Sequence, residues 1–149
     1  MPSLEQELKS GFINERVKAN LNILFTASFL SNRINSNLKP FGLTHEQFNV
    51  LRILRGRYPE SMCQKDILNR MIARNSNVTL IIRKLSKKGW VHVGQSPKDR
   101  REYEINITQE GLQLLQELDK HLYTQQGDFS SLTESEAFHL NALLDKIRT

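Results

Sequence analysis

The sequence predicts a mainly helical protein with one small β-hairpin, an α+β fold. Apolar residues recur at helical spacing in several segments that are bounded by capping and stop signals. Two short runs rich in strand formers, residues 90–93 and 103–107, flank a polar turn and predict the hairpin. The chain has 149 residues, of which 38% are hydrophobic, and this suits one ordinary domain with helical extensions.

The ends of the helices give the clearest local signals. The first helix is predicted over about Phe12 to Leu38, and Pro40 with Gly42 ends it. Later helices begin at capping boxes, in which Ser or Thr is followed three residues on by Glu or Gln. These boxes are Thr44 with Gln47, Ser61 with Gln64, and Thr133 with Glu136.

A further start signal at Asn75 or Ser76 predicts a helix that runs to Lys88, just before Gly89. Its apolar residues fall on one side and should face a core: Val78, Ile81, Ile82 and Leu85. After the hairpin, Thr108 is predicted to cap another helix. The expected order is helix, helix, short helix, helix, hairpin, helix, helix, which is the order of a winged helix-turn-helix.

Basic residues are concentrated in the part of the chain that carries this motif. The whole chain has a formal net charge of +5, but the stretch from Arg74 to Arg101 holds eight Lys or Arg and one acid, Asp99. The rest of the chain is slightly acidic. A basic segment of this kind is expected of a surface that binds a polyanion.

Double-stranded DNA fits this pattern because a helix about 10–12 Å across enters a major groove roughly 12 Å wide. Two arginines at a hairpin turn can also reach an adjacent minor groove. The candidate contacts are Asn75, Ser76, Asn77, Thr79, Arg83, Lys84 and Lys87 on the helix and Lys98, Arg100 and Arg101 in the hairpin. Asp99 is assigned a structural role in the wing, because a carboxylate facing phosphates would be repelled.

Four motifs in this order resemble the MarR family of bacterial regulators. They are the helix from Asn75 to Leu85 with its Ser-Asn-Val-Thr start, the Lys87-Lys88-Gly89 turn, the Asp99-Arg100-Arg101 wing and the Thr108-to-Gly111 helix start. Many members carry arginine where this chain has Leu80, and often Asp-Arg where it has Arg83-Lys84. The first departure changes an expected contact with a base or phosphate, and the second makes the helix more basic. Both therefore affect which operator sequence the protein recognises.

The resemblance implies an obligate homodimer whose terminal helices, residues 1–42 and 108–149, intertwine around DNA-binding lobes of residues 43–107. It implies a pseudo-palindromic operator and a repressor that a small aromatic or anionic effector releases. A candidate effector pocket comprises Phe25, Phe29, Phe41, His45 and Phe48.

Other kinds of protein receive little support. No run of eighteen apolar residues and no secretory signal occurs, so a cytoplasmic protein without a membrane span is expected. Scattered histidines and a single cysteine predict no metal site or cofactor, and no catalytic constellation indicates an enzyme. Two alternatives remain open: a winged helix that binds proteins or any nucleic acid without sequence preference, and redox sensing by Cys63, whose default role is an inert thiol.

Overall fold

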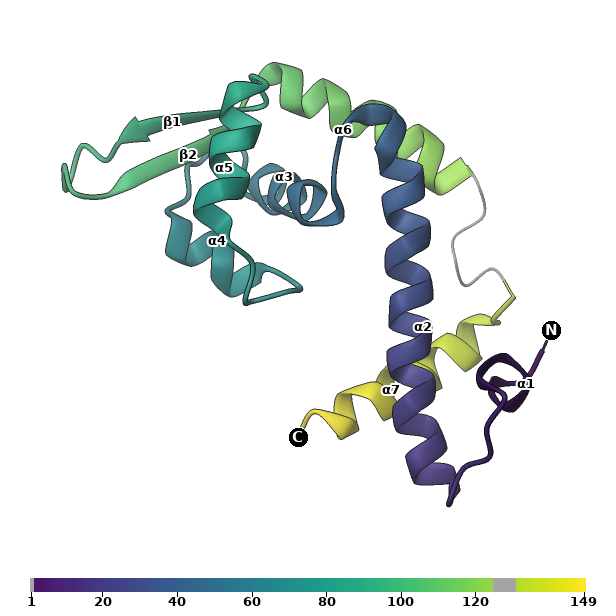
Figure 1. Ribbon diagram of the computed structural model, residues 1–149. Helices are drawn as coiled ribbons and strands as arrows, with labels where there is room; N and C mark the ends of the chain where they lie inside the picture. Colours follow the sequence, from purple (N-terminus) through teal and green to yellow (C-terminus); the bar gives the residue numbers. More distant parts are fainter. Residues whose placement is uncertain (1, 125–130) are drawn as a thin grey trace. The chain divides into compact units, whose positions relative to one another are not determined.

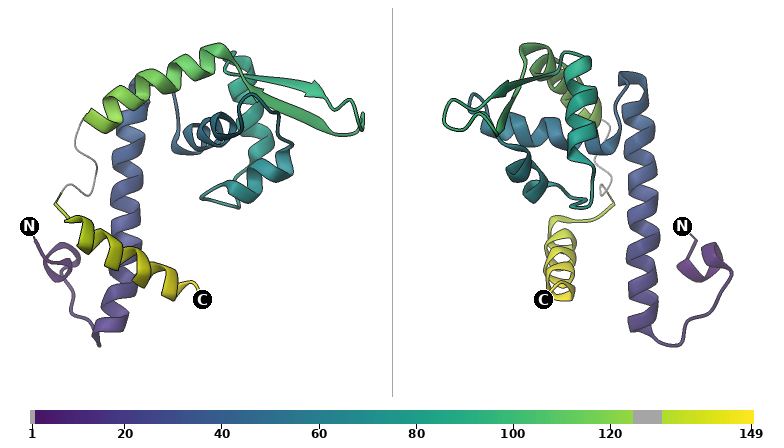
Figure 2. Two further views of the ribbon diagram at one scale, coloured as in Figure 1. Left: turned by 180° about the vertical axis from the view of Figure 1, so that it is seen from behind. Right: turned by 60° about the vertical axis from the view of Figure 1, so that its left-hand side comes forward.

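The computed structural model describes residues 2–124 and 131–149 and confirms the predicted mainly helical fold with one antiparallel hairpin (Figures 1 and 2). The chain divides into two compact units, residues 1–48 and 49–149. The boundaries at residues 42 and 107 that the sequence suggests stay predictions. Among the described residues, no helix is both long and apolar enough to cross a membrane.

The first unit holds one long helix, α2, which covers Glu15–Leu38 and is followed by the 3-10 turn η1 at Lys39–Phe41. The predicted start at Phe12 is wrong. Asn14 is the N-cap, and its side-chain oxygen accepts hydrogen bonds of 3.0 Å from the amides of Arg16 and Val17. Because this cap satisfies the first free amides, the helix begins directly after it.

The sequence did not predict a short helix, α1, at Leu4–Leu8. Lys18 Nζ of α2 lies 2.6 Å from Glu5 Oε1 of α1. The hydrogen bond from Lys18 lowers the pKa of Glu5 to about 2. This ion pair joins α1 to α2, and Leu4 of α1 is buried.

The capping box predicted at Thr44 is confirmed at the start of α3, His45–Arg57. The Thr44 hydroxyl accepts from the Gln47 amide, and the Gln47 side chain accepts from the Thr44 amide, each at 3.2 Å. The box predicted at Ser61 is wrong. Helix α4 covers Gln64–Arg70 with Cys63 as its N-cap, so Gln64 is the first helical residue and its side chain is free to bond elsewhere.

Helix α5 covers Val78–Lys87 and is the amphipathic helix that the sequence predicts. Val78, Ile82 and Leu85 are buried, and Ile81 is half-buried. Strands β1, Val91–Gln95, and β2, Tyr103–Ile107, pair in the register that sets Val93 opposite Ile105. Met62, just before α4, adds two backbone hydrogen bonds to Ile105 at 2.8 and 2.9 Å.

Helix α6 covers Gln109–Thr124 and α7 covers Glu134–Ile147. The predicted cap at Thr108 is confirmed, since its hydroxyl accepts from the Gly111 amide at 3.1 Å and donates to the Gly89 carbonyl at 2.7 Å. The capping box at Thr133 is also confirmed. There the Thr133 amide donates to the Glu136 carboxylate and lowers its pKa.

The core of the second unit is built from the inward faces of α3 to α6 and the hairpin. Its fully buried side chains include Leu51, Leu54, Ile67, Leu85, Ile105, Leu115 and Leu118. Each such side chain stabilises the fold by about 1.5–3 kcal/mol relative to exposure. A partly buried ion pair joins α3 to α6, with Arg55 Nη1 2.7 Å from Asp119 Oδ2. The core therefore holds α5 and the hairpin in a fixed relation to each other.

Gly111 makes the contact between α6 and the hairpin possible. A Cβ atom there would lie 2.4 Å from the Trp90 carbonyl oxygen and 2.7 Å from Ile107 Cγ1. Gly111→Ala should therefore lower the free energy of unfolding by about 2–4 kcal/mol, measured by urea denaturation at one protein concentration.

Gly56 is the matched control, because it also lies in a helix and a Cβ there meets nothing within 4 Å. Gly56→Ala should stabilise the protein by up to about 1 kcal/mol through helix propensity. An unchanged or increased stability of Gly111→Ala would contradict the close packing described for α6.

Candidate nucleic-acid interface

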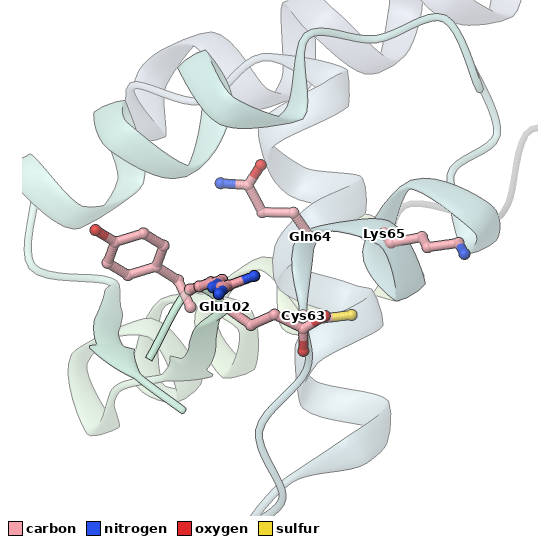
Figure 3. A pocket seen from close by; sticks show the side chains of 6 residues that line it. Cys63, Gln64, Lys65 and Glu102 are labelled. Atoms are coloured by element: carbon pink, nitrogen blue, oxygen red, sulfur yellow. The ribbon is translucent and has the colours of Figure 1, made fainter. Parts of the chain in front are cut away.

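Helices α4 and α5 and the hairpin form one exposed, hollowed surface, which we call the α4–α5–hairpin face. The hairpin extends beyond the two helices in each view (Figures 1 and 2). Three adjoining hollows of about 240, 340 and 550 Å³ lie on this face. Gln64 lines all three hollows, so it lies where they meet. In Figure 3, the side chains of Gln64 and Lys65 point away from each other at the start of α4.

The N-terminal end of α5 differs from its prediction. Asn77 is the N-cap, and its Oδ1 accepts from the Leu80 amide at 3.1 Å. Ser76 lies before the helix, and its hydroxyl donates to the Ala73 carbonyl at 2.7 Å. The predicted start at Asn75 or Ser76 is wrong, because Ser76 closes the preceding turn and Asn77 caps the helix. Asn75 and Asn77 are exposed, and Ser76 is half-buried.

The predicted helix contact Thr79 has a specific partner. Its hydroxyl donates to Gln64 Oε1 at 2.9 Å, which joins the first turn of α5 to the first residue of α4. Thr79 is exposed and Gln64 is half-buried. Gln64 is not among the contacts that the sequence predicts. Its position three residues after Ser61, before a short helix, is typical of a capping box and gives no other signal.

The cationic candidates are all exposed. Arg83, Lys84 and Lys87 lie on α5, whereas Lys98, Arg100 and Arg101 lie in the loop between β1 and β2. Arg83 and Lys87 line the largest hollow, and Arg101 lines the smallest. Lys88 instead lies over the Trp90 ring, with Nζ 4.9 Å from the ring centroid. The α4–α5–hairpin face therefore presents positive charge from two separate elements of the fold.

Asp99 organises the hairpin loop through the backbone. Its Oδ1 accepts from the Arg101 amide at 2.9 Å, and its carbonyl accepts from the Glu102 amide at 3.0 Å. Buried Ser96 accepts at its hydroxyl from the Lys98 amide at 3.3 Å. These bonds form a local turn that carries the exposed arginine side chains outward. The side chain of Asp99 thus bonds the backbone amide of Arg101.

The predicted effector residues lie in the first unit at different depths. Phe48 is buried, Phe41 and His45 are half-buried, and Phe25 and Phe29 are 37% and 56% exposed. The His45 amide donates to Asn35 Oδ1 at 3.0 Å, which ties the start of α3 to α2. A shared pocket for these side chains stays a prediction.

Cys63 is half-buried at the N-cap of α4 and lines the smallest hollow with Gln64 and Arg101. Redox sensing by this thiol stays a hypothesis. Within residues 2–124 and 131–149, no group of three or more His, Cys, Asp or Glu side chains could hold a metal ion.

A helix-turn-helix, here α4 and α5, followed by a basic hairpin defines the winged helix-turn-helix class of DNA-binding proteins. The MarR family model matches residues 43–103. YkoM of Bacillus subtilis, an uncharacterized HTH-type transcriptional regulator, is 30% identical over 144 residues, which cover 93% of this chain and 92% of YkoM. The chain belongs to the MarR family of transcriptional regulators. This membership confirms the prediction of a DNA-binding regulator that is not an enzyme.

Further relatives and solved structures agree. IacR of Pseudomonas putida, an HTH-type transcriptional repressor, is 32% identical over 113 residues, which cover 74% of this chain but only 65% of IacR. A MarR transcription factor from Planctomyces limnophilus is 28% identical with a TM-score of 0.66, covering 93% of this chain and 95% of its own. A MarR mutant from E. coli, solved in complex with operator DNA, shares the fold with a TM-score of 0.76 at 22% identity, covering 93% and 99%.

Proposed function

We propose that the protein binds a pseudo-palindromic DNA operator as a homodimer, in the cytoplasm, and represses transcription until a small molecule releases it. Helix α5 lies in the major groove, and Arg100 and Arg101 reach the neighbouring minor groove. The observation that carries this proposal is the α4–α5–hairpin face, where exposed cations from a helix and a loop surround polar side chains. Phosphate contacts position such a face on DNA, and the polar groups read bases.

Exposed apolar side chains on two helices support the homodimer. On α2, Leu24 and Phe29 are 63% and 56% exposed, and on α7, Leu143 and Ile147 are 60% and 62% exposed. Helix α7 has no buried residue at all. Large apolar patches left open in one chain mark protein interaction sites. A second copy of the chain, in a symmetric interface, is the simplest cover for these patches.

A homodimer gives the operator its symmetry. Two copies of α5 related by a two-fold axis read two half-sites about one helical turn apart, so the operator is a pseudo-palindrome. Release by an effector requires that the small molecule bind the DNA-free arrangement more tightly than the DNA-bound one. A small aromatic or anionic compound near Phe25, Phe29 and His45 stays the proposed effector. The name of IacR supports repression as the outcome of binding.

Selection of genomic fragments by the purified protein tests the proposed function. We expect one or a few fragments that share a pseudo-palindrome, bound about 10³-fold or more tightly than a scrambled duplex of the same composition. Both affinities should fall steeply as salt rises, because bound phosphates release counterions. Equal affinity for the selected and scrambled duplexes would instead support a sequence-neutral binding module.

A further inference from the structure

One side-chain hydrogen bond joins the two helices of the helix-turn-helix at the centre of the α4–α5–hairpin face. Thr79 Oγ1 of α5 donates to Gln64 Oε1 of α4 at 2.9 Å. Gln64 lies at the junction of the three hollows, and Thr79 lines two of them. Neither residue is deeply buried, so a bound duplex would meet both side chains.

This bond determines which polar groups the two side chains present outward. A threonine hydroxyl has one hydrogen, and the hydrogen of Thr79 is directed at Gln64. Thr79 therefore offers DNA a lone pair and a methyl group, but no donor. Gln64 accepts with its oxygen and offers its NH₂ group. Among the described residues, the structure gives no hydrogen-bond acceptor for that NH₂ group.

A lone pair beside a methyl group matches one kind of base pair in the major groove. Adenine offers the N6 amino group as a donor, and its partner thymine offers a C5 methyl. A G·C pair has a donor on cytosine but no methyl, and guanine presents only acceptors, which would repel the Thr79 lone pair. The donor-free Thr79 is therefore suited to an A·T pair.

The position of Gln64 suits a different part of the duplex. In a helix-turn-helix the first helix crosses the sugar-phosphate backbone while the second enters the groove. Gln64 begins the first of these helices, next to Lys65, and a phosphate oxygen can accept from its NH₂ group.

We propose that Gln64 and Thr79 act as one reading unit in each half-site. Gln64 donates to a backbone phosphate and, by accepting the Thr79 hydroxyl hydrogen, restricts Thr79 to an A·T pair. This inference rests on the proposed function, because it assumes that α5 lies in the major groove of an operator. It makes Gln64 a positioning residue for base specificity as well as a phosphate contact.

The test measures the affinity of the full-length chain and its variants for the selected operator and for duplexes changed at single base pairs. Thr79→Ser keeps the hydroxyl and the bond to Gln64 but loses the methyl group. Deoxyuridine in place of thymine removes the C5 methyl group from one base pair at a time. At the pair that Thr79 contacts, this replacement should weaken binding by the wild type at least about twofold and leave binding by Thr79→Ser unchanged.

Two substitutions of Gln64 then separate its two roles. Gln64→Met removes the acceptor, so the Thr79 hydroxyl becomes free to donate to thymine O4 or guanine O6. The preference for A·T at that pair should fall by at least about fivefold. Gln64→Glu keeps an acceptor for Thr79 but cannot donate to phosphate, so overall affinity should fall while the preference stays.

Lys65→Met is the matched control, since it removes a neighbouring charge without touching Thr79. It should weaken binding to all duplexes alike and reduce the salt slope by about 2, one for each protomer of the dimer.

The inference is overturned if Gln64→Met binds the operator with the wild-type preference at that pair, or if deoxyuridine at no position weakens binding by the wild type. Should Gln64→Met not fold, Gln64→Glu still decides, because a lost A·T preference or an unchanged overall affinity in that variant would overturn the inference. A wild type that binds all duplexes equally would refute the proposed function itself.

Discussion

Replacing Arg100 and Arg101 by alanine should weaken operator binding by at least about 100-fold, because each protomer of the dimer loses two charge-assisted contacts. Both side chains are exposed in the hairpin loop, whose turn is held by Asp99 and Ser96. The loop should therefore keep its conformation without them. Fluorescence anisotropy over a range of salt concentrations should also show a log–log slope that is shallower by about 4, since the dimer loses four cationic side chains.

A second double variant, Lys39→Ala with Arg57→Ala, serves as the control. It removes the same amount of charge from η1 and the end of α3, outside the α4–α5–hairpin face. Its operator affinity should change little, and both double variants should remain dimers. Loss of the dimer in the Arg100 and Arg101 variant, or equal weakening by both double variants, would contradict the assignment of the hairpin to DNA.

Replacing Leu143 and Ile147 by aspartate should convert the dimer into monomers. Both side chains are about three-fifths exposed in the single chain, at 60% and 62%, so the fold of one chain does not depend on them. In a dimer interface, each new carboxylate would have to be buried without a partner, which costs several kcal/mol. Analytical ultracentrifugation at micromolar concentration should show the monomer mass, and binding to the two-half-site operator should fall with it.

Ala142 provides the matched control on the same helix. At 3.6 residues per turn, it faces away from the apolar side that Leu143 and Ile147 share. Ala142→Asp should therefore leave the dimer intact. A dimer that survives in the Leu143 and Ile147 variant would show that α7 does not form the interface.

The elements that could be predicted from the sequence are those set by local chemistry. Helix α5 follows from buried Val78, Ile82 and Leu85 at helical spacing, and the caps at Thr44 and Thr133 follow from capping boxes. The helix–hairpin order follows from these signals, and the resemblance of the motifs to the MarR family then pointed to the correct family.

The features that were missed depend on residues distant in the sequence. Gln64 is bonded to Thr79, fifteen residues on, so the capping interpretation at Ser61 could not reveal its role. Met62 pairs with Ile105 across more than forty residues of chain. Helix α1 is five residues long, too short for any periodicity, and is held by the ion pair of Glu5 with Lys18.

The start of α5 shows a further limit of local signals. The sequence predicts the start at Asn75 or Ser76, but Asn77 is also a residue type that caps helices well. In the structure, the Ser76 hydroxyl bonds the Ala73 carbonyl, and this leaves Asn77 as the cap. The placement of two candidate contacts therefore depended on the turn that precedes the helix.

Hydroxyl-radical footprinting of the selected operator tests most directly whether two copies of the α4–α5–hairpin face bind one duplex. We expect two protected patches of equal strength on the same side of the DNA, with centres roughly 10–10.5 base pairs apart. Additional weak protection should flank each patch where the hairpin reaches the minor groove. A single protected patch, or even protection along the whole fragment, would contradict this account.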